Sequence, residues 1–223
     1  SGDIDVDGTT NLDIVDVDVS LTVDGTVKLN GNFPTGTDNI ALGNAALSGG
    51  SLSGAGNIAI GDSVLQNMTS GSNAVAIGRD AMNTGIYTGG DAIAIGRAAL
   101  QNLTTGSNNV AIGGLALTSN TTGPSNTAVG YVALTANTTG TQNVAVGAYA
   151  LVANISSNNS TAIGYAALSL NTGASNTAVG ASAMVDNTSG VNNTAIGVNS
   201  LTNNTTASFN IALGGSSLAA NTT

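Results

Sequence analysis

The sequence predicts an all-β fold, a β-solenoid of about eleven coils of 17 residues, on three observations. A glycine preceded by alanine and an aliphatic residue recurs eleven times at intervals of 16 to 18 residues, from Gly43 to Gly214. Counted from this glycine as position 0, position −2 is always Ala, −1 is Ile, Val or Leu, −3 is Ile, Val or Thr, and +4 is Leu or Met. Aromatic residues make up 3% and charged residues 7%, too few large side chains for a conventional globular core. A period this short indicates stacked coils that bury their apolar residues only against their neighbours.

Positions −3 to −1 are expected to form a short strand in every coil. Side chains two residues apart share one face of a strand, and β-branched residues suit this setting. We expect the aliphatic positions −3, −1 and +4 to fill the interior, with Val129 and Leu134 as representatives. The alanine at −2 and the residue at −4, which is Asn in eight of the eleven repeats, would then face the other way.

The unbroken alanine column predicts close approach of another surface. A strand face that met only water would tolerate larger polar residues in some repeats, and an exposed apolar stripe is unusual on soluble monomers. We expect this surface to be an identical chain at a three-fold axis, with a second sheet of the same chain as the alternative. The residues expected at this oligomer interface are Ala111, Ala128, Ala145, Ala162 and Ala178.

The rest of each coil is predicted to consist of a corner, a six-residue segment and a turn. The glycine suits a sharp corner where φ is positive or a Cβ would clash. The segment that follows, for example residues 131–136, fits a short helical turn or a second short strand, and its pattern does not separate the two. The coil closes on a turn such as residues 137–140, Asn-Thr-Thr-Gly, whose stacked copies are expected to form amide ladders.

Residues 1–38 are predicted to be a separate acidic, β-stranded stalk or connector, and residues 39–223 the repeat solenoid. Eight of the twelve acidic residues lie in this first segment, in strict alternation with aliphatic residues at 3–7 and 16–19. Asp3, Asp5, Asp7 and Gly8 also match the opening of a calcium loop. The twelfth position of that loop is Ile14, however, and the chain contains no glutamate, so a solvated strand face is the preferred interpretation.

Composition argues against an enzyme, a cofactor or metal site, nucleic-acid binding and membrane insertion. The chain has no histidine and no cysteine, its only lysine is Lys28, and its net charge is −9. A basic stripe for nucleic acid is therefore lacking, and no apolar run is long enough to span a membrane. The carboxylates of the solenoid occupy different positions of the coil, so paired catalytic acids are not expected; they are Asp62, Asp80, Asp91 and Asp186, with Asp38 at the boundary of the first segment.

Position +1 varies and is expected to point outward. It carries Arg79, Arg97, Tyr131 and Tyr165, which are candidate contacts for a cell-surface saccharide or protein receptor. The alternative is a plain surface, with an ion pair between Asp62 and Arg79 that contributes little and with aromatic rings that cover the rod.

Residues 126–140, Asn-Thr-Ala-Val-Gly-Tyr-Val-Ala-Leu-Thr-Ala-Asn-Thr-Thr-Gly, and their copies resemble the repeats of tail-fibre proteins of bacterial viruses. The Ala-Ile-Gly core is similar to the heads of trimeric autotransporter adhesins, and residues 6–18 resemble the stalk segments of phage fibres. The resemblance implies a homotrimer that forms the shaft or adhesive surface of an extracellular fibre, on a virion that attaches to its host or on a bacterial cell surface. The period is longer than that of the adhesin heads, and the chain lacks a recognisable receptor-binding tip.

Two other functions are compatible with the same solenoid fold. A secreted bacterial adhesin would be told apart from a phage fibre by its neighbouring sequence, a membrane-anchor barrel or virion genes. An ice- or crystal-binding solenoid needs a flat, regular Thr face, whereas the Thr pairs here lie in turns and are interrupted at Ile155-Ser156 and Thr172-Gly173. The sequence stops inside a repeat, so we expect it to be a fragment, a processed product or the ordered part of a longer protein.

Overall fold

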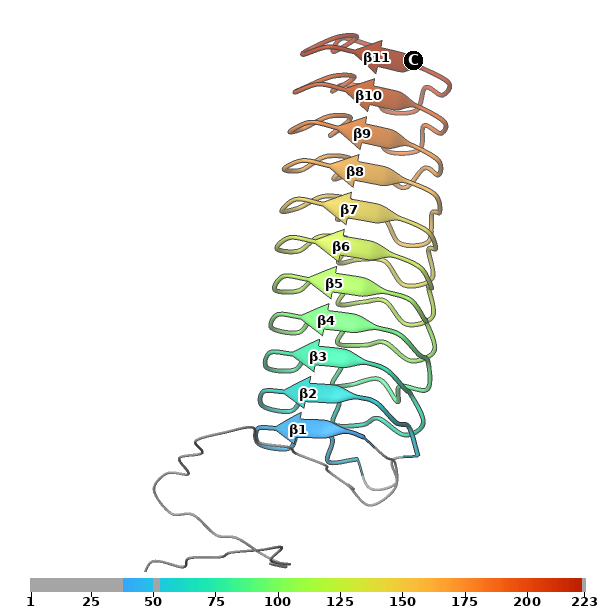
Figure 1. The fold of residues 1–223 in the computed structure, drawn as a ribbon. Coiled ribbons are helices and arrows are strands. Elements are labelled where there is room, and N and C mark those ends of the chain that lie inside the picture. Colours follow the sequence, from blue (N-terminus) through green and yellow to red (C-terminus); the bar gives the residue numbers. More distant parts are fainter. Residues whose placement is uncertain (1–37, 50–52, 222–223) are drawn as a thin grey trace, which may run out of the picture.

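The computed structural model describes residues 38–49 and 53–221, which form a single stack of coils around one eleven-stranded parallel sheet (Figure 1). Each strand pairs only with the strands of the coils before and after it, in the order β1 to β11. The predicted all-β solenoid is confirmed. No helix occurs among these residues, so none is present that could cross a membrane. The strands are β1 Ile40–Leu42, β2 Ile58–Ile60, β3 Val75–Ile77, β4 Ile93–Ile95, β5 Val110–Ile112, β6 Thr127–Val129, β7 Val144–Val146, β8 Thr161–Ile163, β9 Thr177–Val179, β10 Thr194–Ile196 and β11 Ile211–Leu213.

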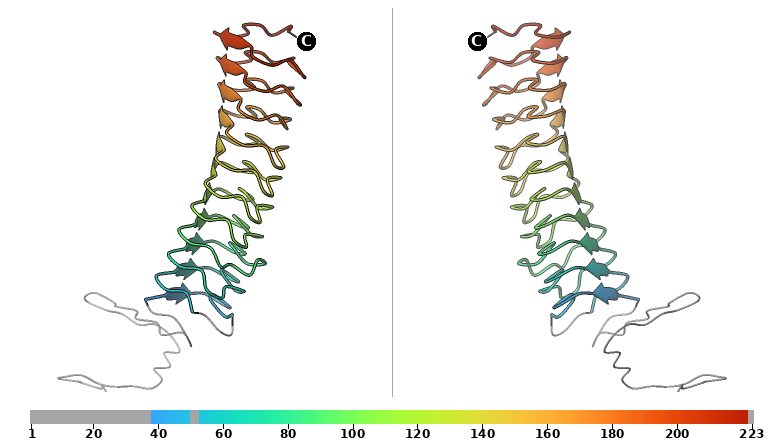
Figure 2. Two further views of the ribbon diagram at one scale, coloured as in Figure 1. Left: turned by 90° about the vertical axis from the view of Figure 1, so that its right-hand side faces the viewer. Right: turned by 90° about the vertical axis from the view of Figure 1, so that its left-hand side faces the viewer.

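The strands stack in register, so every residue lies over its equivalent one coil away. Ala128 in β6, for example, pairs with Ala111 in β5 and with Ala145 in β7. Hydrogen bonds between coils continue beyond the strands: the amide of Val132 donates to the carbonyl of Gly114, and the amide of Leu134 donates to the carbonyl of Ala150, at 3.0 and 2.9 Å. Figure 2 shows the strands along one edge of the stack and the connecting loops on the other.

The alanine column faces the interior of the coil, which corrects our expectation about the two faces of the strand. The alanines at −2 in β2 to β11 are buried within the single chain, and only Ala41 in β1 is partly exposed. The five alanines expected at an oligomer interface have no exposed surface, so they are not an interface with a second chain; they are Ala111, Ala128, Ala145, Ala162 and Ala178. Leu134 is buried as predicted, but Val129 is only partly buried and belongs to the outer face of the sheet. The coil is narrow, and the leucine at +4 fills it from the opposite wall. An alanine at −2 leaves room for that leucine, and the larger −3 and −1 side chains must therefore point outward.

The corner and the segment after it contain several left-handed backbone conformations. Gly130 has a φ of +138°, and a Cβ on it would lie 2.6 Å from the carbonyl oxygen of Gly147 in the next coil, so the position excludes every other residue. Val132 and Leu134 also have positive φ, at 61° and 53°. The segment that the sequence left open is consequently neither a helix nor a strand. It is a chain of turns that aims the +4 side chain into the core.

Two asparagine columns form amide ladders, of which the one in the closing turn was expected and the one at position −4 was not. At position −4, Oδ1 of Asn126 accepts from the backbone amide of Asn143 at 3.0 Å, and its Nδ2 donates to the carbonyl of Gly140 at 2.8 Å. At position +7, Nδ2 of Asn137 donates to Oδ1 of Asn120 at 3.0 Å. These side chains are completely buried, so the ladder provides hydrogen-bond partners for the carbonyls of the closing turn where water is excluded.

Tyr87 takes the place of the −4 ladder in the coils of β3 and β4, whereas the ladder is present between Asn39 and Asn57 in the first two coils. Positions −4 there are Ala74 and Ala92, and the ring of Tyr87 lies against Gly71 and Gly89, where a Cβ would come within 3 Å of it. Tyr87 is fully buried, and its hydroxyl has no hydrogen-bond partner among the described residues. Burial raises the pKa of this phenol well above its usual value, and the negative charge of Asp91 raises it further.

The predicted acidic stalk of residues 1–38 lies outside the described residues except for Asp38, and the calcium-loop alternative lies outside them entirely. The structure describes the solenoid from Asp38 onward.

We expect Leu134→Ala to lower the free energy of unfolding by about 2–5 kcal/mol, because it opens a cavity between two stacked leucines. Val129→Ala, on the outer face of the same coil, is the matched control and should cost less than half as much. Urea unfolding followed by circular dichroism measures both. Equal losses would contradict the assignment of the two faces.

Tyr87→Phe should stabilise the chain, and increasingly so at alkaline pH. The mutation removes a buried hydroxyl without a partner, whose cost is about 1–3 kcal/mol. Below about pH 10 the phenol is neutral in both the folded and the unfolded chain, so its ionisation does not affect the free energy of unfolding. Above the pKa of about 10 of an unfolded tyrosine, the unfolded phenol ionises while the folded one, with its raised pKa, stays neutral, so the parent loses stability as the pH rises. The stability difference between Tyr87→Phe and the parent, measured by urea unfolding at pH 8 and pH 11, should therefore widen. A difference that stays constant would contradict the burial of Tyr87.

A tyrosine ladder as candidate functional site

The four candidate receptor-contact residues all lie on the outside of the stack. Arg79, Arg97, Tyr131 and Tyr165 are exposed, each immediately after the corner glycine of its coil. The prediction that position +1 points outward is thus confirmed for these residues. Strict stacking places Arg79 and Arg97 on adjacent coils, separated from Tyr131 by the coil of Gly114.

A fifth residue, Tyr149, joins the two tyrosines into a ladder. Its ring centroid lies 5.7 Å from that of Tyr131 and 5.8 Å from that of Tyr165, with interplanar angles of 86° and 77°. Such edge-to-face contacts are a favoured arrangement of aromatic pairs. All three rings remain accessible, with exposed fractions of 48%, 39% and 60% for Tyr131, Tyr149 and Tyr165. We call these three residues the tyrosine ladder.

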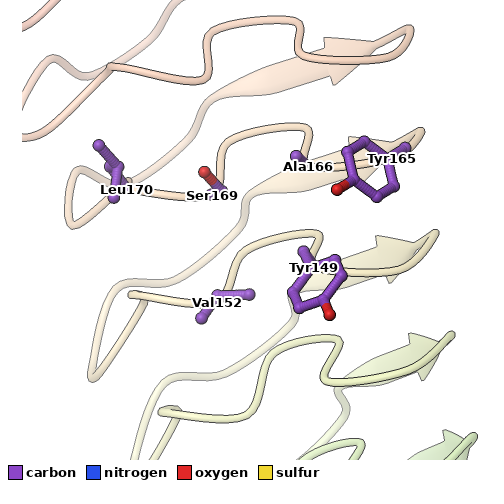
Figure 3. A pocket seen from close by; sticks show the side chains of 6 residues that line it. All are labelled: Tyr149, Val152, Tyr165, Ala166, Ser169 and Leu170. Carbon is purple, nitrogen blue, oxygen red and sulfur yellow. The ribbon is translucent and has the colours of Figure 1, made fainter.

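A groove with a volume of about 260 Å³ lies beside the upper two rings of the ladder (Figure 3). Tyr149 and Val152 come from one coil, and the other lining residues come from the next. Figure 3 shows the two rings at one end of the groove, with Val152 and Leu170 at the other. We call it the tyrosine groove; its lining residues are Tyr149, Val152, Tyr165, Ala166, Ser169 and Leu170.

The arginines take no part in this groove. Nε of Arg79 lies 3.6 Å from Oδ2 of the adjacent Asp80, and both side chains are accessible to solvent. The alternative ion pair between Arg79 and Asp62 does not form; Asp62 instead accepts a hydrogen bond from Nδ2 of Asn44 at 2.9 Å. An exposed pair such as Arg79 and Asp80 contributes little to stability.

The acidic residues of the solenoid do not assemble into a metal centre. Within residues 38–49 and 53–221, no three acidic, histidine or cysteine side chains gather in a group that could hold a metal ion.

Sequence reasoning missed Tyr149 because it searched one column at a time. Tyr149 occupies position +2, whereas Tyr131 and Tyr165 occupy +1, and the intervening coil has Ala148 at +1. Counting aromatic residues by coil would have found three consecutive coils with one tyrosine each. The contribution of Val152 and Leu170 to the groove depends on how the turns after the corner fold, which the sequence pattern left open.

Comparisons of the chain with models of protein families, with curated proteins and with solved structures found no match. A functional assignment therefore depends on the geometry described above.

Proposed function

We propose that this chain is the shaft or adhesive surface of an extracellular fibre, as in the tail fibre of a bacterial virus, and that three copies associate along a common axis. The observation that carries the proposal is the outer face of the sheet, an apolar strip that no part of the described chain covers. A regular rod of stacked coils with a receptor-contacting stripe suits a protein that spans distance and attaches to a surface.

The outer sheet face consists of the −3 and −1 side chains of all eleven strands. Every −1 residue is Ile, Val or Leu, and the −3 residues are Ile, Val or Thr. Several are well exposed, for example Ile112 at 38% and Ile163 at 41%. At a strand spacing of about 4.8 Å the strip is about 50 Å long. A continuous exposed apolar strip is a feature that often marks a protein–protein interface.

A second copy of this chain suits the outer sheet face as a partner. The strip repeats at every coil and carries no charge, so an identical strip from another copy matches it in length and in polarity. A symmetric assembly would cover the strips of all copies along the shared axis, as closed homo-oligomers do. The proposed interface is therefore the outer sheet face. It is not the alanine column, which the sequence suggested and which is buried inside the coil.

Native mass spectrometry at several concentrations tests the association. We expect a species of three times the 21.4 kDa of one chain. Ile112→Lys combined with Ile163→Lys should shift the mass to a single chain without unfolding it, because an unpaired charge on a buried apolar face is costly. The matched control is Thr122→Lys combined with Thr139→Lys, in exposed turns of the same stack; it should keep the parental mass.

A parent chain that stays monomeric at all concentrations would contradict the trimer. The fibre itself is tested by immunogold labelling of intact virions or cells from the source, which should mark surface fibres. Labelling confined to the cell interior would contradict an extracellular role.

A further inference from the structure

Phe209 is an aromatic residue in a column of the stack that is otherwise polar. It occupies position −5, where φ is positive in all eleven coils. The other ten coils have Asn, Asp, Ser, Gln or Gly at this position, and Asn, Asp and Gly are the residues that best tolerate a left-handed backbone. Phe209 has a φ of 63° and is 77% exposed. An unfavourable backbone conformation and an exposed phenyl ring therefore coincide at this residue.

The ring extends the apolar surface of the outer sheet face. Phe209 comes two residues before β11, whose Ile211 and Leu213 are exposed on that face. The backbone amide of Phe209 donates to the carbonyl of Val191 at 3.1 Å, which fixes the residue on the coil below. No charged residue occurs in residues 187–221. An exposed, uncharged patch that includes an aromatic ring is typical of a protein–protein interface.

The opposite edge of the same two coils has an apolar side chain on which a ring can pack. Figure 1 shows the chain entering each strand at one edge of the sheet and leaving it beyond the arrowhead at the other. Val198 occupies position +1, after the corner at the arrowhead edge, and is 55% exposed. The next coil has Gly215 at this position, where a Cβ would meet no atom nearer than the carbonyl oxygen of Val198, at 3.7 Å. Gly215 therefore leaves Val198 uncovered.

The ring and the uncovered valine lie at matching heights on the stack. Phe209 and Gly215 belong to the coil of β11, and Val198 belongs to the coil of β10, to which the amide of Ser216 bonds through the carbonyl of Val198 at 2.9 Å. Rotation about an axis along the stack keeps these heights and brings the −5 edge of one copy to the +1 edge of the next. A closed assembly uses the same such contact in every copy.

We infer that the phenyl ring of Phe209 packs on Val198 and Gly215 of a second copy of this chain and anchors the association at the C-terminal coils. Aromatic residues are enriched in the buried core of interfaces, because they remove a large apolar area from water at a small loss of side-chain entropy. Burial of the ring also explains why an unfavourable residue occupies position −5 in this coil alone. The inference rests on the proposed association of copies and assigns its anchor residues.

Two asparagine substitutions test the contact without disturbing the coil. Phe209→Asn and Val198→Asn each install a residue that the same column carries elsewhere, Asn192 at −5 and Asn44 at +1. Native mass spectrometry over a concentration series should show each variant dissociating at a concentration about tenfold or more above that of the parent. Phe209→Asn should resist urea at least as well as the parent when both are single chains, since Asn suits the left-handed backbone. Ile155→Asn, which replaces an exposed side chain in a closing turn, is the control and should dissociate like the parent.

A disulfide between copies tests the contact directly, because the chain has no cysteine of its own. The double variant with Phe209→Cys and Val198→Cys, oxidised by glutathione disulfide, should run as a covalent trimer on a non-reducing gel and return to single chains on reduction. Each single-cysteine variant should stay a single chain when oxidised alone, and a mixture of the two should give a covalent pair.

The outcomes separate this inference from the proposed trimer. A parent trimer that associates equally well with Phe209→Asn and Val198→Asn, or that forms no disulfide in the double variant, contradicts this inference alone. A covalent pair as the end product of the double variant supports the contact and contradicts the trimer. A parent that stays a single chain at every concentration contradicts both.

Discussion

In-register stacking is the constraint on which the rest of this structure depends. Backbone hydrogen bonds join each coil to its neighbours along the strand, after the corner and in the closing turn, so a residue has its own equivalent above and below it. A side chain therefore fits at a position only if similar side chains fit at the same position of the neighbouring coils. Small residues can fill a narrow interior in this way, and buried asparagines can bond to their equivalents in the neighbouring coils, as Asn137 does with Asn120 and Asn143 with Asn126. Because of the same constraint, the aliphatic column at position −1 continues along the outer face over all eleven strands.

The interior is filled from two walls that differ in size. The strand contributes only alanine at −2, and the turn segment contributes alanine, serine or, once, valine at +3 and leucine or methionine at +4. Leucine reaches the interior from a left-handed backbone conformation, for example at Leu134 with a φ of 53°. Such conformations cost about 1–2 kcal/mol for a residue with a side chain. Burial of the leucine among stacked leucines offsets this cost, since it is worth about 1.5–3 kcal/mol.

Periodicity was sufficient to predict the solenoid, the strand at −3 to −1, the corner glycine and the asparagine ladder of the closing turn, because each is a property of a column. It did not decide which face of the strand is inside. Size favoured Val129 over Ala128 as the core residue, yet the invariance of the alanine was the better indicator, since only a crowded position excludes every larger residue. The tyrosine groove escaped prediction for a different reason. Its residues lie at positions +1, +2, +5 and +6, and turns with positive φ bring them together in a way that no periodic pattern encodes.

Thiol labelling tests the orientation of the strand most directly, because the chain has no cysteine of its own. Ala128→Cys and Val129→Cys place a single thiol on the inner and the outer face of β6. The account predicts that the thiol of Ala128→Cys is protected from a maleimide at every protein concentration until the chain unfolds. The thiol of Val129→Cys should react readily in dilute protein and more slowly as the chains associate. Labelling of Ala128→Cys with protection of Val129→Cys, or protection of Ala128→Cys that disappears on dilution to single chains, would contradict the account.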